Sequence, residues 1–181
     1  MIPLKEDMET LLVVLVCIAL IVFGVMTLGQ GFLVSTDTAA LSMDDITVTK
    51  GEILRTDISI IDGRSVGAGT VELTLENTGQ MKLASFGKWD IIVEYYDATN
   101  NFYSKWLQYT EGSPGNNEWH TAGIYLDASE NTTEAFEPGI LNPEEEIKIE
   151  AKLSPPPRYG TSIETIISTP NGVKGEWSMI Y

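Results

Sequence analysis

Hydrophobic and polar positions divide the chain into two parts of different periodicity. Residues 10–36 carry no charged side chain, and apolar residues follow one another there without a polar face. From about Ile46 onward, apolar and polar residues alternate in short runs. A continuous apolar run predicts a helix buried on all sides, whereas alternation predicts strands with one buried face. We therefore predict an N-terminal hydrophobic helix over residues 1–40 and a β-domain over residues 41–181.

The apolar run is long enough to cross a lipid bilayer. The 27 uncharged residues between Glu9 and Asp37 exceed the roughly 20 that a membrane-spanning helix needs. Many of them are β-branched, which favours a strand in water, but in lipid or in a helical bundle the backbone must satisfy its own hydrogen bonds. A net acidic head precedes the run, which argues against a cleaved secretory signal. The helix therefore requires burial, either in lipid or among other helices.

Nine alternating runs predict the strands of the second part. They are residues 45–51, 53–62, 69–79, 88–98, 102–110, 120–128, 145–153, 162–169 and 172–181. Many short strands with almost no helical period are typical of an antiparallel sandwich or barrel. Pro170 and the Asn171-Gly172 pair predict a tight hairpin turn, and Asp62–Gly69 is expected to form a flexible hairpin tip. The predicted fold class is α+β, a long helix followed by an all-β antiparallel sandwich of Ig-like or barrel-like form.

Composition narrows the range of partners and modifications. The formal net charge of −15 argues against nucleic acid, since phosphate binding needs a basic stripe. Cys17 is the only cysteine, so the chain has no internal disulfide. Asn131 opens an Asn-Thr-Thr triplet in a polar loop and is a candidate for glycosylation if the domain is outside the cell.

Candidate chemistry is sparse, and we predict no catalytic, cofactor or metal site. His120 is the only histidine, so a zinc site or a Ser-His-Asp arrangement would depend on this one residue. The adjacent acids at Asp44-Asp45 and Glu144–Glu146 fit solvated turns better than an acid-base pair. An enzyme held on a membrane stalk remains the weakest alternative.

Three short stretches resemble one family. Val25–Ala40, "VMTLGQGFLVSTDTAA", is similar to the "LGAGFF" stretch and following polar turn of archaellins, the archaeal flagellins. Leu75–Leu83, "LENTGQMKL", resembles the "NTG" strand end of archaellin and archaellar stator β-domains. Leu141–Ile147, "LNPEEEI", resembles their "PGE" turn, with Glu144 in place of the glycine.

The resemblance implies a type IV pilin-like subunit of a motility filament on the cell surface. Its helix would lie in the cytoplasmic membrane before assembly and pack with many copies into a filament core afterwards, with the β-domains outside. An assembly ATPase and a membrane platform protein are the implied partners. The helix residues expected in the filament core are Leu11, Val14, Ile18, Ile21, Val25, Leu28, Gly29, Gly31 and Phe32.

The start of the chain departs from the family pattern. Family precursors carry a basic leader ending in glycine, with glutamate as the fifth mature residue, whereas no basic leader precedes the apolar run here. The chain is then either already mature or processed differently. Glu9 is the candidate for the family glutamate, whose proposed role is to neutralise a neighbouring amino terminus in the apolar core.

Other functions share these features and stay open at this stage. They are a membrane-anchored archaellar stator, a cell-surface binding protein and an adhesive pilus subunit. The apolar segment runs past one bilayer thickness, which favours a helix packed in a filament.

Overall fold

The computed structural model comprises one long helix and a β-domain. It describes the backbone of residues 4–181 and the side chains of residues 10–32, 43 and 46–181. The chain divides into two compact units, residues 1–48 and 49–181, and each is described by itself.

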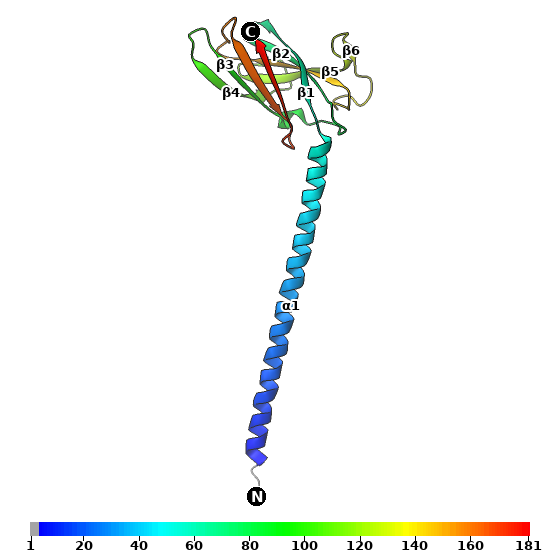
Figure 1. Cartoon of the computed structure of the whole chain (residues 1–181), viewed down its shortest axis with the longest axis vertical. Helices are drawn as coiled ribbons and strands as arrows, with labels where there is room; N and C mark the ends of the chain where they lie inside the picture. The colour runs from blue at the N-terminus through cyan, green and yellow to red at the C-terminus, as the bar shows by residue number, and fades with distance from the viewer. Residues whose placement is uncertain (1–3) are drawn as a thin grey trace. The chain divides into compact units, whose positions relative to one another are not determined.

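Helix α1 (Leu4–Arg55) is 52 residues long and is drawn in blue to cyan in Figure 1. It contains one stretch, Thr10–Phe32, that is long and apolar enough to cross a membrane. The helix continues beyond residue 40, where we placed the end of the N-terminal segment. The predicted strand at residues 45–51 is therefore wrong.

The helix persists there because nothing in the sequence stops it. Residues 32–50 contain neither proline nor glycine, so the hydrogen-bond ladder can extend one residue at a time, which costs far less than starting a new element. The alternation of Ile46 with Val48 suggested a strand, but Met43 and Ile46 are also spaced as neighbours on one helix face. The period alone could not separate the two.

Within residues 49–181, nine strands and one short 3₁₀ helix follow α1. They are β1 (Ser59–Gly67), β2 (Thr70–Glu76), η1 (Phe86–Lys88), β3 (Asp90–Tyr96), β4 (Phe102–Tyr109), β5 (Glu118–Asp127), β6 (Thr132–Thr133), β7 (Glu146–Lys152), β8 (Ser162–Ser168) and β9 (Lys174–Ile180).

The strands form one nearly closed, barrel-like sheet, which confirms the predicted fold class. Its order is β1-β2-β7-β5-β4-β3-β8-β9, with the short β6 paired to β5. All pairs are antiparallel except β4 with β5, which run parallel over Gln108↔Glu118 and Tyr109↔Trp119. This parallel pair departs from the purely antiparallel prediction.

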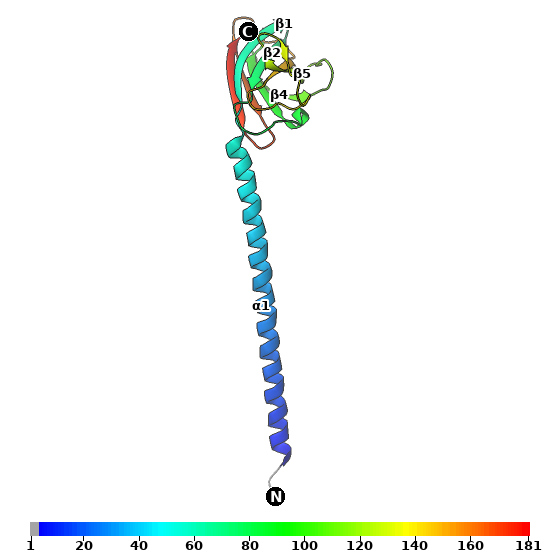
Figure 2. The same ribbon diagram turned by 90° about the vertical axis from the view of Figure 1, so that its right-hand side faces the viewer.

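The two ends of the sheet approach each other without pairing. Figures 1 and 2 both show β1 beside β9, and a Cβ added at Gly63 would lie only 2.8 Å from Cδ1 of Trp177. The sheet therefore closes through side-chain packing at this seam. Glycine at position 63 is required for the close approach of the indole ring.

Alternating apolar residues from both sides fill the interior. Leu75, Ile91, Leu107, Trp119 and Ile147 are fully buried at 0% exposure. Each sits on a strand whose next residue points outward, so burial follows the two-residue period predicted from the sequence. Burial of these side chains is the main source of the domain's stability.

The turns agree only in part with the predictions. The Asn-Gly turn is confirmed: Gly172 has a φ of +86°, and its N–H donates to the carbonyl of Thr169 at 2.9 Å. The hairpin tip predicted at Asp62–Gly69 is displaced, because β1 extends to Gly67 and the turn lies between β1 and β2. Residues 132–133 form a strand that the sequence did not indicate.

Candidate functional site

The candidate site is the surface of α1, where apolar side chains are exposed to an unusual extent. Leu11 is 67% exposed, Ile21 64% and Leu28 77%. The remaining predicted core residues with a side chain are equally open: Val14 56%, Ile18 57%, Val25 64% and Phe32 71%. An exposed apolar surface of this extent on a single chain indicates that lipid or another protein covers it in the cell.

Apolar exposure also extends beyond the stretch that could span a membrane. Met43 is 70% exposed, Ile46 53% and Val48 55%. At a rise of about 1.5 Å per residue, these side chains lie roughly 16–24 Å beyond Phe32 along the helix. The apolar stretch itself is about 35 Å long and would fill the hydrocarbon layer of a bilayer, so lipid tails would not reach these three side chains. The sequence did not single out these three residues, because we assigned residues 41–181 to the β-domain and placed Ile46 and Val48 on a strand.

The helix backbone leaves room for close approach. A Cβ added at Gly24, Gly29 or Gly31 would meet no atom within 4 Å outside the adjoining helix backbone. The hydroxyl of Thr27 donates to the carbonyls of Phe23 and Gly24 at 3.0 Å, so it presents no unsatisfied donor. Glycines on a helix surface allow another helix to pack at short distance. The side chain of Glu9, the candidate family glutamate, lies outside the described residues.

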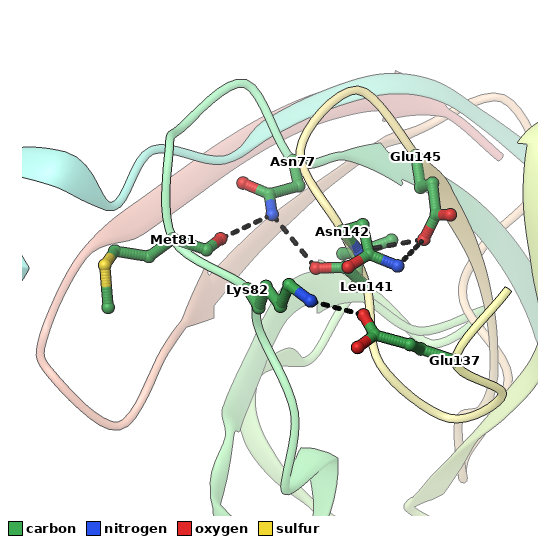
Figure 3. A network of polar contacts seen from close by, with 7 residues as sticks. All are labelled: Asn77, Met81, Lys82, Glu137, Leu141, Asn142 and Glu145. Atoms are coloured by element: carbon green, nitrogen blue, oxygen red, sulfur yellow. Dashed lines mark hydrogen bonds and ion pairs between the residues drawn. The ribbon is translucent and has the colours of Figure 1, made fainter.

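Two of the stretches that carried the family resemblance meet in the β-domain (Figure 3). The side-chain amide of Asn77 donates to the carbonyl of Met81 at 2.8 Å and to that of Leu141 at 3.0 Å. Glu145 in turn accepts from the backbone N–H and the side-chain amide of Asn142, at 2.8 and 3.2 Å. Lys82 pairs with Glu137 at 2.5 Å across the same two loops.

This network has a structural role. Asn77 is fully buried and Glu145 is 5% exposed, and a buried polar group is tolerated only when it is hydrogen-bonded. Glu144, which directly precedes Glu145, has a φ of +68°, in the left-handed region that favours glycine. The resembling family has glycine at this position. The two loops are therefore joined to each other where β2 ends and β7 begins.

An open groove of about 890 Å³ lies where β4 and β5 diverge. It is lined by apolar side chains such as Tyr109 and Ile124 and by the polar groups of Thr121 and Glu134. Burial, followed by the nearby charge of Glu145, raises the pKa of Glu134. Neither Oγ1 of Thr121 nor Oε1 of Glu134 has a hydrogen-bond partner in the fully described β-domain. No histidine or cysteine lines the groove.

His120 lies outside that groove. Its Nε2 is 3.6 Å from Oε2 of Glu150, too long for a hydrogen bond but close enough for a weak charge interaction if the ring is protonated. The described residues contain no group of three His, Cys, Asp or Glu side chains that could hold a metal ion.

Asn131 is exposed, as a modified residue must be. Its Oδ1 accepts a hydrogen bond from Nζ of Lys148 at 2.9 Å, which directs the side chain across the sheet surface. Its φ of +53° places it in a turn, directly before Thr132 and Thr133 of β6.

Solved structures with a similar fold include components of the archaellum. The chain is similar to the archaellum periplasmic stator protein FlaG from Sulfolobus acidocaldarius, at 18% identity and a TM-score of 0.50 over 68% of this chain and 99% of that one. It also resembles the stator complex of FlaF and FlaG from the same organism, at 18% identity and a TM-score of 0.49 over 68% and 89%. The archaeal flagellum of Methanospirillum hungatei strain JF1 matches at 13% identity and a TM-score of 0.48 over 97% and 92%.

These similarities concern the fold. The predicted resemblance to archaellum proteins is confirmed at that level by the FlaG match, which covers about two thirds of this chain. No protein-family model matches the chain, and no curated protein matches its sequence.

Proposed function

We propose that this chain is the structural subunit of an extracellular helical filament of archaellum type. Residues 4–55 would pack against the same helix in other copies to form the filament core, and the β-domains would form the outer surface. The proposal depends most on Met43, Ile46 and Val48, whose exposed apolar side chains lie beyond the reach of lipid tails. Only protein can cover them, and another copy of α1 presents a surface of the same kind.

The route to the filament follows from the apolar stretch. Before assembly, Thr10–Phe32 would cross the cytoplasmic membrane, since its length matches the hydrocarbon layer. Extraction into a filament exchanges lipid contacts for helix contacts, a process that needs an energy source. We propose that a membrane assembly ATPase and a platform protein supply it, as the family resemblance implies.

A membrane-anchored archaellar stator is the second candidate, favoured by the fold of FlaG. In that case Thr10–Phe32 would remain in lipid, and α1 beyond Phe32 would be covered by a partner other than its own copies. Both candidates make the chain a structural component; neither requires the Glu134 groove or His120 to perform chemistry.

Cryo-electron microscopy of filaments sheared from cells that express this chain tests the proposal. We expect a helical density in which α1 lies in the core and the β-domains lie outside. Filaments that lack this chain, together with its full recovery in the membrane fraction, would rule out the filament and favour the stator.

We also propose that Asn131 is glycosylated. Its amide oxygen faces Lys148, which leaves the amide nitrogen for the glycan, and Thr133 completes the triplet. Mass spectrometry of the surface-exposed protein tests this: a peptide containing Asn131 that appears only at its unmodified mass would exclude the modification.

A further inference from the structure

The β-domain carries two pairs of glutamates that face each other across neighbouring strands. Glu72 on β2 lies opposite Glu150 on β7, and Glu94 on β3 lies opposite Glu164 on β8. All four side chains point away from the core, because the residues next to them in each strand are buried. Like charges directly opposite each other destabilise a sheet. Each pair therefore calls for a compensating cation.

In the first pair, Glu72 forms an ion pair with an arginine of the same sheet. Nη2 of Arg64 on β1 lies 2.6 Å from Oε1 of Glu72. On the other side, Nε2 of His120 on β5 lies 3.6 Å from Oε2 of Glu150. The row across β1, β2, β7 and β5 thus places both carboxylates between nitrogen-bearing side chains.

The second pair has no such compensation. Its neighbours in the row are Ser104 on β4 and Ser178 on β9. The Ser104 hydroxyl donates to Oε1 of Glu94 at 3.0 Å, but neither Glu94 nor Glu164 forms an ion pair within residues 49–181, all of which the structure describes.

The nearest candidate cations are directed elsewhere. Nζ of Lys105 lies 5.1 Å from the centre of the Tyr103 ring, and its strand partner Val93 is a core residue. Lys174 on β9 pairs with Ser168, two rows away from the glutamates, and Glu176 lies between.

Exposed apolar side chains border this pair on both sides. In one neighbouring row Ile92 lies between Trp106 and Ile166, and Trp106 is 58% exposed. In the other, Tyr96 lies opposite Phe102, with ring centres 5.3 Å apart. The indole N–H of Trp106 donates to Oδ1 of Asp90 at 2.8 Å, which fixes the ring on the surface. A depression of about 300 Å³ between β8 and β9 includes Glu164, Ile166 and Glu176.

We propose that this outer face of β4, β3, β8 and β9, the aromatic-acidic face, binds a basic polypeptide surface of a different protein. Lysine or arginine side chains of the partner would lie against Glu94 and Glu164, and its apolar side chains would cover Trp106 and Phe102. Cations also bind the faces of exposed aromatic rings, so both parts of the surface favour the same partner chemistry. The inference holds for the filament and for the stator.

Charge argues against a second copy as the partner. Residues 49–181 carry ten basic and twenty acidic side chains, so two β-domains repel each other. Half of the basic side chains are already engaged inside their own domain. These are Arg64, Lys82, Lys105, Lys148 and Arg158.

A peptide of alternating lysine and leucine, labelled with fluorescein, tests the proposal by anisotropy against the full chain in nonionic detergent at low salt. We expect Glu94→Gln combined with Glu164→Gln to weaken binding about five- to tenfold, the loss of two exposed ion pairs. The matched control, Glu72→Gln with Glu150→Gln, removes the same charge from the pair in which Arg64 already neutralises Glu72 and should change binding less than about twofold. Trp106→Ala should weaken binding as well, whereas Phe136→Ala, 76% exposed elsewhere on the domain, should not.

If both glutamate double variants weaken peptide binding equally, the effect comes from the net charge of the domain, and the proposal is wrong. The proposal is also wrong if the Glu94→Gln and Glu164→Gln variant unfolds at the same temperature as the parent chain and binds the peptide equally well. Analytical sedimentation of the unlabelled chain is the last measurement. If the parent chain self-associates and the Glu94→Gln and Glu164→Gln variant does not, the partner is another copy of this chain and the proposal of a different protein is wrong.

Discussion

At the scale of single residues, the most informative positions are those where the backbone restricts the side chain. Glu144 occupies a left-handed conformation, with a φ of +68°, in a loop whose buried neighbours Asn77 and Glu145 hold it in place. The family resemblance predicted glycine here, and the structure supplies the physical reason. The sequence alone could identify the departure from the motif, but not that the departure is strained.

Glu144→Gly is expected to stabilise the β-domain by about 1 kcal/mol, because glycine adopts a positive φ without steric cost. Thermal unfolding followed by circular dichroism measures the change. As a control, Glu146→Gly in the extended strand β7 should lower the midpoint, since glycine there adds freedom to the unfolded chain and the hydrogen bond from the N–H of Ala128 to Oε2 of Glu146 is lost. A lower midpoint for Glu144→Gly would show that the Glu144 side chain makes a compensating contact.

Asp97, at the turn between β3 and β4, is expected to make the stability of the β-domain depend on pH. Burial alone raises its pKa, but hydrogen bonds from Thr99 and Asn101 outweigh burial and lower the pKa below the ordinary value. The carboxylate therefore adds stability that is fully present above the unfolded pKa of about 3.9 and is lost as the pH falls through the folded pKa. Asp97→Asn should melt below the parent chain at pH 7, and the gap should close below about pH 4. A gap that stays constant from neutral to acidic pH would contradict this origin.

At the scale of elements, α1 determines which functions are possible. Thr10–Phe32 could be predicted from composition because an uncharged apolar run of this length has few alternatives. Its continuation to Arg55 could not, since residues 45–51 fit both a strand and a helix by period. The continuation matters because it carries Met43 and Ile46, exposed apolar side chains that a bilayer around Thr10–Phe32 would leave uncovered.

Substitutions in these two parts of α1 can distinguish membrane insertion from filament assembly. Met43→Glu combined with Ile46→Glu should abolish filaments by placing charges in a helix contact, yet leave the chain in the membrane fraction. Val16→Asp, inside the apolar stretch, should impair both. The conservative pair Met43→Leu and Ile46→Leu serves as the control and should assemble. Normal filaments from the glutamate variant would exclude contacts between copies along this part of α1.

At the scale of the whole molecule, the two units differ in what they require for stability. Residues 49–181 enclose a complete core, whereas α1 needs an external cover. The last turn of the helix is also part of the β-domain: Gln80 donates to the carbonyl of Arg55 at 2.7 Å, and Asn171 donates to the hydroxyl of Thr56 at 2.7 Å.

A chain of residues 49–181 is therefore expected to fold alone as a monomer without detergent. A shorter chain of residues 58–181 keeps the core residue Ile58 but loses the bonds to Arg55, Thr56 and Asp57 and should be less stable by about 2–4 kcal/mol. Size-exclusion chromatography and thermal melts compare the two. Equal melting temperatures would mean that the helix end contributes nothing to the domain.

The sequence by itself determined the class of each part, because an uncharged apolar run and a two-residue alternation each have few physical solutions. It also located the Asn171-Gly172 turn, whose chemistry is local. The tertiary structure decided what depends on contacts distant in the chain. It extended α1 through an ambiguous period, paired β4 with β5 in parallel inside the sheet, and joined Asn77 to Leu141. It also placed Arg64 against Glu72 while leaving Glu94 and Glu164 without an ion pair, a difference that only the register of the strands could create.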